Sequence, residues 1–228
     1  MIPLYHDFED ETVLVFGGGS VGYRKARRFA AEADVVVVSP QFDDRFDDVD
    51  DDRFVDGGND RGSIKLVRAA PSPADVDAWL DRLEPALVVI ATDNDAVNAA
   101  AVDAARNRGV LRNNAVRSGS RDPGSVTIPA TVTDGPVSVA ISTGAQSPAL
   151  AKHLRERIEA EIDGAGAMAE LSGGLRHSLR DRGLSPSDRR AAIRAVVRSD
   201  AVWKALHTGD SKGEQEAERV IDQVVGDT

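Results

Sequence analysis

The sequence has 228 residues, of which 41% are hydrophobic and 29% charged, a composition that suits a folded soluble protein and excludes a disordered chain. No apolar run approaches the roughly 20 residues of a membrane-spanning helix, and the first residues lack the basic and apolar stretches of a secretory signal. We therefore expect a cytoplasmic protein with no membrane partner. Without cysteine, the chain cannot form a disulfide, a thiolate metal site or a cysteine nucleophile.

The formal net charge is −10, and a nucleic-acid partner is therefore not expected, because such binding needs a basic footprint. The cations are strongly biased, with 23 arginines and five lysines. Abundant aspartate with scarce lysine is typical of a salt-rich cytoplasm, where the Debye length falls to about 3 Å near 1 M salt. An ordinary acidic protein is the alternative.

Strands and helices are predicted to alternate over the first half of the chain. Short apolar runs predict buried strands, and longer periodic segments predict helices. The predicted strands are 12–16, 35–38 (ended by Ser39-Pro40), 64–67, 87–91 and 110–111, and the predicted helices are 21–31, 73–83 and 95–108. The aspartate-rich segment 41–62 is expected to be a solvated surface excursion. This alternation predicts an α/β fold, a Rossmann-like doubly wound parallel sheet.

The pattern changes after residue 114. Two extended runs, 125–132 and 137–142, surround a turn signal and predict an antiparallel hairpin. The predicted helices that follow are 149–162, 165–181, 187–198 and 213–225. We therefore expect three parts, which are a Rossmann-like NAD-binding domain (1–113), a β-hairpin dimerisation insert (114–146) and a helical domain (147–228).

A glycine-rich loop follows the first predicted strand and matches G-x-G-x-x-G. In this pattern Gly17 permits the tight turn, Gly19 lets the backbone approach a pyrophosphate, and Gly22 lets helix and strand pack closely. Ser20 and Val21 open the next helix, whose N-terminal N–H groups suit phosphates. The loop predicts a dinucleotide site, and a merely flexible glycine turn is the alternative.

The end of the second predicted strand departs from the usual dinucleotide pattern. Ser39, Pro40 and Gln41 stand where an acidic residue normally holds the adenosine ribose, and no carboxylate follows until Asp43. These residues are expected to border the cofactor, but the sequence does not choose between NAD and NADP. A cluster of cations on the first helix could favour the 2′-phosphate of NADP or face solvent: Arg24, Lys25, Arg27 and Arg28.

A second polar loop, with Thr92, Asp93 and Asn98, follows the fourth predicted strand. Ligands of open α/β sheets bind beyond the carboxyl ends of the strands, so we expect these residues to contact the cofactor. Asp93 or Asn94 could also simply cap the next helix.

Taken together, these motifs resemble the precorrin-2 dehydrogenase module of siroheme synthases. The resemblance covers roughly residues 4–160 and rests on Gly17-Gly18-Gly19-Ser20-Val21, Arg24-Lys25-Ala26-Arg27, Ala91-Thr92-Asp93, Asn98, Ile128-Pro129-Ala130, Gly135-Pro136, Ala140-Ile141-Ser142-Thr143-Gly144, Ser147-Pro148-Ala149-Leu150-Ala151 and Leu154-Arg155. It implies NAD-dependent oxidation of precorrin-2, a tetrapyrrole with eight carboxylates, to sirohydrochlorin. It also implies a homodimer formed through the hairpin and the helical tail.

The resemblance also implies a set of substrate contacts. The expected substrate-binding residues are Asn114, Arg117, Ser142, Thr143, Ser147 and Arg155. Further cations lie in segments expected to line the cleft, namely Arg112, Arg121, Lys152 and Arg157, with ordinary surface charge as the alternative for at least half of the cations in these segments.

One position departs from the family, because Arg117 stands where an aspartate implicated in dehydrogenation and iron insertion is expected. Asp122, in a loop about two residues longer than usual, is the candidate catalytic residue, with a plain turn residue as the alternative. The four histidines form no metal-ligand spacing, so no metal site is predicted.

Two other functions stay open from the sequence. Some members of the family also insert ferrous iron into sirohydrochlorin, and this chain could be such a bifunctional enzyme. A non-catalytic NAD(P)-sensing domain would need the glycine loop but none of the substrate residues.

Overall fold

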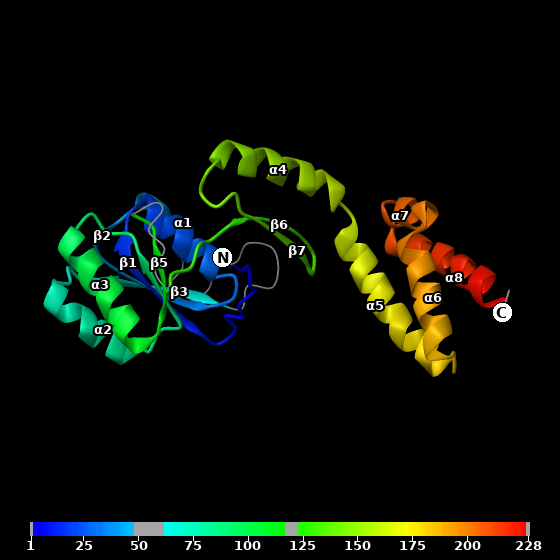
Figure 1. Cartoon of the computed structure of the whole chain (residues 1–228), viewed down its shortest axis with the longest axis horizontal. Helices are drawn as coiled ribbons and strands as arrows, with labels where there is room; N and C mark the ends of the chain where they lie inside the picture. The colour runs from blue at the N-terminus through cyan, green and yellow to red at the C-terminus, as the bar shows by residue number, and fades with distance from the viewer. Residues whose placement is uncertain (1, 48–61, 117–122, 227–228) are drawn as a thin grey trace. The chain divides into compact units, whose positions relative to one another are not determined.

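The structure, a computed structural model, describes residues 2–47, 62–116 and 123–226. The chain divides into two compact units, Met1–Ile128 and Pro129–Thr228, each described by itself below (Figure 1). The three-part division at residues 113 and 146 remains a prediction. Residues 123–128 belong with the first unit because backbone groups of Gly124 and Val126 bond Arg112 in the last strand of its sheet.

The first unit is built on a five-stranded parallel sheet with the order β3-β2-β1-β4-β5. Its strands are β1 (Thr12–Gly18), β2 (Asp34–Phe42), β3 (Ser63–Arg68), β4 (Leu87–Ile90) and β5 (Leu111–Asn114). All four pairings between neighbours are parallel, with β1 at the centre between β2 and β4. This order confirms the predicted Rossmann-like fold.

Alternating residues of β1 fill the two sides of this sheet. Val13 and Val15 belong to the core beneath α1, whereas Leu14 and Phe16 belong to the core beneath α2 and α3. All four side chains are fully buried, and each contributes about 1.5–3 kcal/mol through burial. A strand buried on both faces reads as a continuous apolar run, which is why the sequence revealed it.

The helices of the first unit begin and end at recognisable signals. They are α1 (Ser20–Phe29), α2 (Val76–Leu83) and α3 (Asp95–Arg108), with short 3-10 turns η1 (Asp44–Phe46) and η2 (Pro73–Asp75). The Asn94 side chain caps α3 by accepting from the N–H groups of Ala96 and Val97. Gly109 ends α3 in the left-handed conformation, with φ of 69°.

The prediction that the second strand ends at Ser39-Pro40 is wrong, since β2 runs on to Phe42. Phe42 pairs with Gly18 after an irregularity in the register, whereas Pro40 pairs with neither neighbouring strand. The strand therefore passes through a proline because the missing N–H falls at an unpaired position.

The second unit combines a hairpin with five helices. Its elements are β6 (Ala130–Asp134), β7 (Val137–Ile141), α4 (Pro148–Glu161), α5 (Ala165–Asp181), α6 (Pro186–Val197), α7 (Asp200–Leu206) and α8 (Asp210–Gly226). Strands β6 and β7 are antiparallel around Gly135, and α4 packs along β6. The hairpin is confirmed, but its first strand begins at Ala130, because Ser125 forms only an isolated bridge with Arg112.

Helices α5 to α8 share a separate apolar core. Leu179, Val196 and Ile221 are fully buried at its centre. The sequence did not predict α7, whose seven residues are too short to display a helical period. Its signal is the cap, since the Ser199 side chain accepts from the Val202 N–H.

Candidate functional site

The glycine loop lies between β1 and α1, at the carboxyl edge of the sheet. Gly17 has a φ of +113°, and a Cβ there would collide with the Ala91 carbonyl oxygen. A Cβ on Gly22 would collide with the Gly17 carbonyl oxygen. Both positions therefore require glycine, and the loop is pressed against the end of β4.

Gly18 is a further requirement that the G-x-G-x-x-G pattern does not name. A Cβ on Gly18 would meet the Phe42 ring and the Gln41 carbonyl oxygen at the end of β2. In the opposite direction, the Gly18 carbonyl oxygen accepts a 2.8 Å hydrogen bond from the Asp43 N–H. The loop thus touches the ends of both strands that flank β1.

Gly19 faces open space, in contrast to its neighbours. A Cβ at this position would have no heavy atom within 4 Å. Gly19 is also the N-cap of α1, without a side-chain cap, and Ser20 is exposed beside it. The first N–H groups of a helix have no intrahelical partners, so this open side presents donors of the kind that bind diphosphates. The loop fits a dinucleotide.

At the end of β2, Ser39 is buried, and its hydroxyl donates to the Gln41 carbonyl oxygen at 2.6 Å. This bond shapes the chain around Pro40 and Gln41, which are exposed beside the glycine loop. Arg68 of β3 donates to the Pro40 carbonyl oxygen at 3.2 Å. Ser39 therefore shapes this turn, and the cofactor contacts of Ser39, Pro40 and Gln41 remain predictions.

Asp43 directly follows β2. The sequence did not identify it as a cofactor contact, because the predicted second strand ended at Ser39-Pro40. The carboxylate of Asp43 accepts hydrogen bonds from Arg45, at 2.7 Å from Nε and 2.9 Å from Nη2. These bonds, helped by the Arg45 backbone N–H, lower the pKa of Asp43 to about 2. A carboxylate that is ionised at neutral pH thus follows the end of β2, the strand end at which dinucleotide-binding folds carry an acidic residue for the ribose.

The loop after β4 is held by a buried amide. Asn98, only 6% exposed, donates from Nδ2 to the Thr92 carbonyl oxygen at 2.9 Å. The Thr92 hydroxyl donates to Asn98 Oδ1 at 2.6 Å. Asn94 caps α3, and Asp93 is exposed. Thr92 and Asn98 therefore fix the loop that abuts Gly17, and Asp93 remains the exposed polar side chain of the three predicted contacts.

Strand β5 brings Asn114 to the same edge, where it pairs with Ile90 and accepts from the Val116 N–H. The expectation that Arg112 lines the cleft is wrong, because its side chain is 3% exposed and donates to the Pro123 carbonyl oxygen at 2.6 Å. Buried Asn113 donates to the Val126 carbonyl oxygen, and its Oδ1 has no partner within the described part of the chain. Arg117, Arg121 and Asp122 lie outside the described residues.

The other predicted substrate residues lie in the second unit, near the start of α4. Ser147 caps α4 by accepting from the Leu150 N–H at 3.2 Å. The Thr143 hydroxyl donates to the Ser147 carbonyl oxygen, and the Ser142 hydroxyl accepts from the Gly144 N–H. Arg155 pairs with Glu159 at 2.9 Å. The three hydroxyls thus organise the entry to α4, and their contacts with substrate remain predictions.

Helix α1 adds positive charge next to the glycine loop. Burial, followed by the nearby charges of Arg28 and then Arg24, lowers the pKa of Lys25. Burial also lowers the pKa of Arg28. Burial is thus the main cause of both shifts, and the neighbouring cations of α1 add to it at Lys25.

The comparisons with known proteins agree with this geometry and with the resemblance seen in the sequence. Residues 4–130 match the family model described as "Putative NAD(P)-binding", and residues 134–161 match "Sirohaem biosynthesis protein central". Siroheme synthase 1 of Aeromonas salmonicida is 33% identical over 212 residues, which are 92% of this chain and 41% of that protein. The chain thus spans about two fifths of the length of this relative.

Two further relatives are similar over nearly their whole length. A precorrin-2 dehydrogenase of Methanosarcina barkeri is 28% identical, with 96% of this chain and 93% of that protein covered. The solved structure of SirC, precorrin-2 dehydrogenase, has a TM-score of 0.65 at 22% identity and covers 96% of this chain and 100% of that chain. This likeness supports the fold. Through the match that spans its whole sheet domain, the chain belongs to the NAD(P)-binding family of that model.

Proposed function

We propose that this protein catalyses the NAD-dependent oxidation of precorrin-2 to sirohydrochlorin. In this reaction the substrate loses a hydride and a proton, and the products are sirohydrochlorin, NADH and H⁺. The observation that carries the proposal is the convergence of three loops, after β1, β2 and β4, on one edge of the sheet. The names of the relatives, siroheme synthase and precorrin-2 dehydrogenase, supply the substrate class.

Different residues of the chain would bind different parts of the cofactor. NAD supplies the hydride acceptor. The open side of Gly19 and the first N–H groups of α1 would hold its diphosphate. Asp43 would accept a hydrogen bond from the adenosine ribose, and this contact would favour NAD because the 2′-phosphate of NADP would meet a carboxylate. The hydrogen bonds between Asn98 and Thr92 hold the loop after β4 in its position against Gly17.

The substrate side of the proposal rests on the family resemblance. Ser142, Thr143 and the start of α4 at Ser147 would bind carboxylates of the macrocycle, with Arg155, Asn114 and Arg117 as further contacts. Asp122 is proposed to accept the proton. We leave iron insertion out of the proposal, because arginine at position 117 places a cation where the family has a carboxylate and would repel Fe²⁺.

We also propose a homodimer. A two-stranded hairpin is only marginally stable by itself, and β6 and β7 pair only with each other among the described residues. Light scattering coupled to size exclusion should give a mass near twice 24.2 kDa, and a monomer at micromolar concentration would contradict this assembly.

We further propose a cytoplasmic protein adapted to high salt. The arginine bias and the net charge of −10 support this setting. Separately, no helix within the described ranges is long and apolar enough to cross a membrane. Circular dichroism should show unfolding upon dialysis from molar KCl into dilute buffer, and full stability there would contradict the salt adaptation.

The test of the reaction is turnover of precorrin-2 with NAD in molar salt. The reduced nicotinamide absorbance should rise by one equivalent per sirohydrochlorin formed. The same assay distinguishes the alternative of a sensing domain, which would bind NAD without any turnover. Absence of turnover with both NAD and NADP, in a protein that is folded by circular dichroism, would overturn the proposal.

A further inference from the structure

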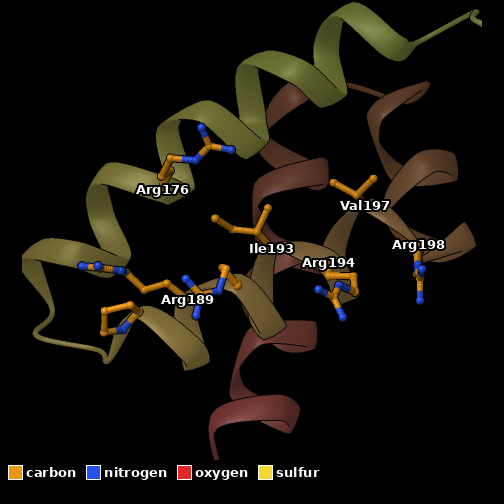
Figure 2. Close-up of a pocket in the computed structure, with 8 residues that line it drawn as sticks. Arg176, Arg189, Ile193, Arg194, Val197 and Arg198 are labelled. Carbon is orange, nitrogen blue, oxygen red and sulfur yellow. The ribbon is translucent and has the colours of Figure 1, made fainter.

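A groove lined by arginine lies between α5 and α6 in the second unit, with a volume of about 560 Å³ (Figure 2). One wall carries Arg176 from α5. The other carries the remaining arginines, from α6 and its C-terminal cap: Arg189, Arg190, Arg194 and Arg198. No carboxylate lines this groove within the described part of the chain.

The α6 residues of the groove follow a strict helical spacing. Positions 186, 189, 190, 193, 194, 197 and 198 repeat at intervals of three and one, which places them on a single face of the helix. Ala192 and Val196, on the opposite side of α6, are fully buried in the core of the unit. Helix α6 therefore has one face that packs and another that presents arginines over its whole length.

These five guanidinium groups have no partners among the residues that the structure describes. None of them forms an ion pair or a side-chain hydrogen bond with any residue that the structure describes. Other arginines of the same unit are paired, such as Arg182 with Glu218 at 3.0 Å and Arg219 with Glu216 at 2.8 Å. Arginines outside the groove are thus paired with carboxylates, whereas no carboxylate among the described residues lines the groove.

The folding of α6 does not explain this arrangement. Arg190, Arg194 and Arg198 follow one another at i, i+4 spacing, at which like charges destabilise a helix. Arg189 and Arg190 also lie toward the N-terminal end of α6, where the helix dipole disfavours cations. A cost of this kind is consistent with a ligand that supplies the missing negative charge.

The floor of the groove narrows the choice of ligand. Ile193 is partly buried between the two helices, and Val197 is 39% exposed beside it (Figure 2). A small inorganic anion would leave this apolar surface uncovered. A nucleic acid is disfavoured by the net charge of −10, and a second copy of the same face would bring arginine against arginine.

We propose that this groove binds a flat organic polycarboxylate, whose apolar body covers Ile193 and Val197 while its carboxylates pair with the surrounding guanidinium groups. Arginine is suited to this role because its planar fork binds a carboxylate through two parallel hydrogen bonds. The macrocycle of the proposed reaction has this chemistry, so the groove would hold a tetrapyrrole apart from the nucleotide loop. That identification rests on the proposed function, whereas the ligand class rests on the groove.

The test measures binding of uroporphyrin, an octacarboxylate macrocycle, to the full chain by fluorescence, in salt that keeps the protein folded. The double variant Arg190→Gln/Arg194→Gln should lose about tenfold or more in affinity at one site per chain. The control Arg180→Gln, on α5 one turn after Arg176 but outside the groove, should stay within about twofold of wild type. A second variant, Val197→Asp, should abolish the same site by placing a carboxylate on its floor.

Citrate and inorganic phosphate serve as probes that carry charge without a flat apolar body. Each should compete at least about tenfold more weakly than uroporphyrin. Unchanged uroporphyrin affinity in the double variant and in Val197→Asp would overturn the proposal, and so would phosphate competing as well as uroporphyrin. Turnover of precorrin-2 by the wild-type chain separates the two proposals. A wild-type chain that turns over precorrin-2 but does not bind uroporphyrin at the groove refutes the groove alone, and one that binds uroporphyrin there without turnover refutes the reaction alone.

Discussion

The nucleotide edge of the first unit and the arginine groove of the second unit are built by opposite means. At the nucleotide edge, Gly17, Gly18 and Gly22 lie so close to backbone atoms that an added Cβ would collide, whereas Gly19 faces open space. In the groove, long charged side chains surround open space and form no ion pair or side-chain hydrogen bond with any described residue. The first site is therefore constrained by shape and the second by charge, so substitutions that change shape and those that change charge should affect the two sites differently.

The largest expected effect comes from Gly22→Ala, which tests the constraint of shape. The new Cβ would press on the Gly17 carbonyl, and backbone cannot move aside as a side chain can. We expect a loss of about 3 kcal/mol or more in the free energy of unfolding. Denaturant titration in molar salt measures it.

Gly19→Ala is the matched control, since its Cβ meets nothing within 4 Å. Its unfolding free energy should stay within about 0.5 kcal/mol of wild type, while its affinity for NAD falls because the open side of the loop is filled. If both variants unfold alike, the loop is not constrained in the way described.

The next effect tests the buried amide beside the loop. Asn98→Ala removes the side-chain donor to the Thr92 carbonyl oxygen and one of the partners of the Thr92 hydroxyl, which also bonds the Asn94 backbone. This loss should cost about 2 kcal/mol of unfolding free energy. Thr92→Val should cost about 1 kcal/mol, and the double variant less than the sum, because both changes remove one shared interaction. Strict additivity in the double-mutant cycle would contradict the coupling.

A charge substitution at the nucleotide edge should change selectivity more than stability. Asp43→Asn removes the carboxylate that favours NAD, so the ratio of NAD to NADP affinity should fall about tenfold. Asp44→Asn, at the neighbouring exposed position, is the control and should leave the ratio unchanged. An unaltered ratio in Asp43→Asn would show that this carboxylate does not reach the ribose.

The smallest expected effect concerns pH and lies in the second unit. A hydrogen bond to the Trp203 carbonyl oxygen, and then the Asp163 carboxylate, raise the pKa of His207. The protonated form is thus favoured in the folded state, so its contribution is complete below the ordinary pKa and is lost as the pH rises through the raised value. His207→Gln should lower the melting temperature by about 1–2 °C at pH 5 and not at pH 9. A difference that grows toward pH 9 would contradict this assignment.

The sequence predicted the sheet and the glycine loop because both depend on local patterns. Buried parallel strands appear as apolar runs, and the three glycines stand at fixed spacing before a helix. It could not predict that Arg112 turns inward to Pro123, since this depends on a contact made only after folding. The sequence did not place Asp43 among the cofactor contacts, because a proline normally marks the end of a strand, whereas β2 continues through Pro40 to Phe42.

The sequence alone could predict that the arginines of α6 share one face, because their helical spacing is visible in it. The sequence could not predict that these arginines lack partners among the described residues, because this depends on where the carboxylates of α5 and α8 lie after packing. Patterns along one element can therefore predict a face, whereas the state of its charges requires the packed unit.

The central claim is that the loop at Gly17–Gly22, with Asp43 beside it, holds a nicotinamide dinucleotide. Calorimetric titration of the folded wild-type chain with NAD in molar salt tests it most directly. One site per chain is expected, with weaker binding in Gly19→Ala and a preference for NAD over NADP that Asp43→Asn reduces. Absence of binding by either dinucleotide, or equal binding by wild type and Gly19→Ala, would contradict the account.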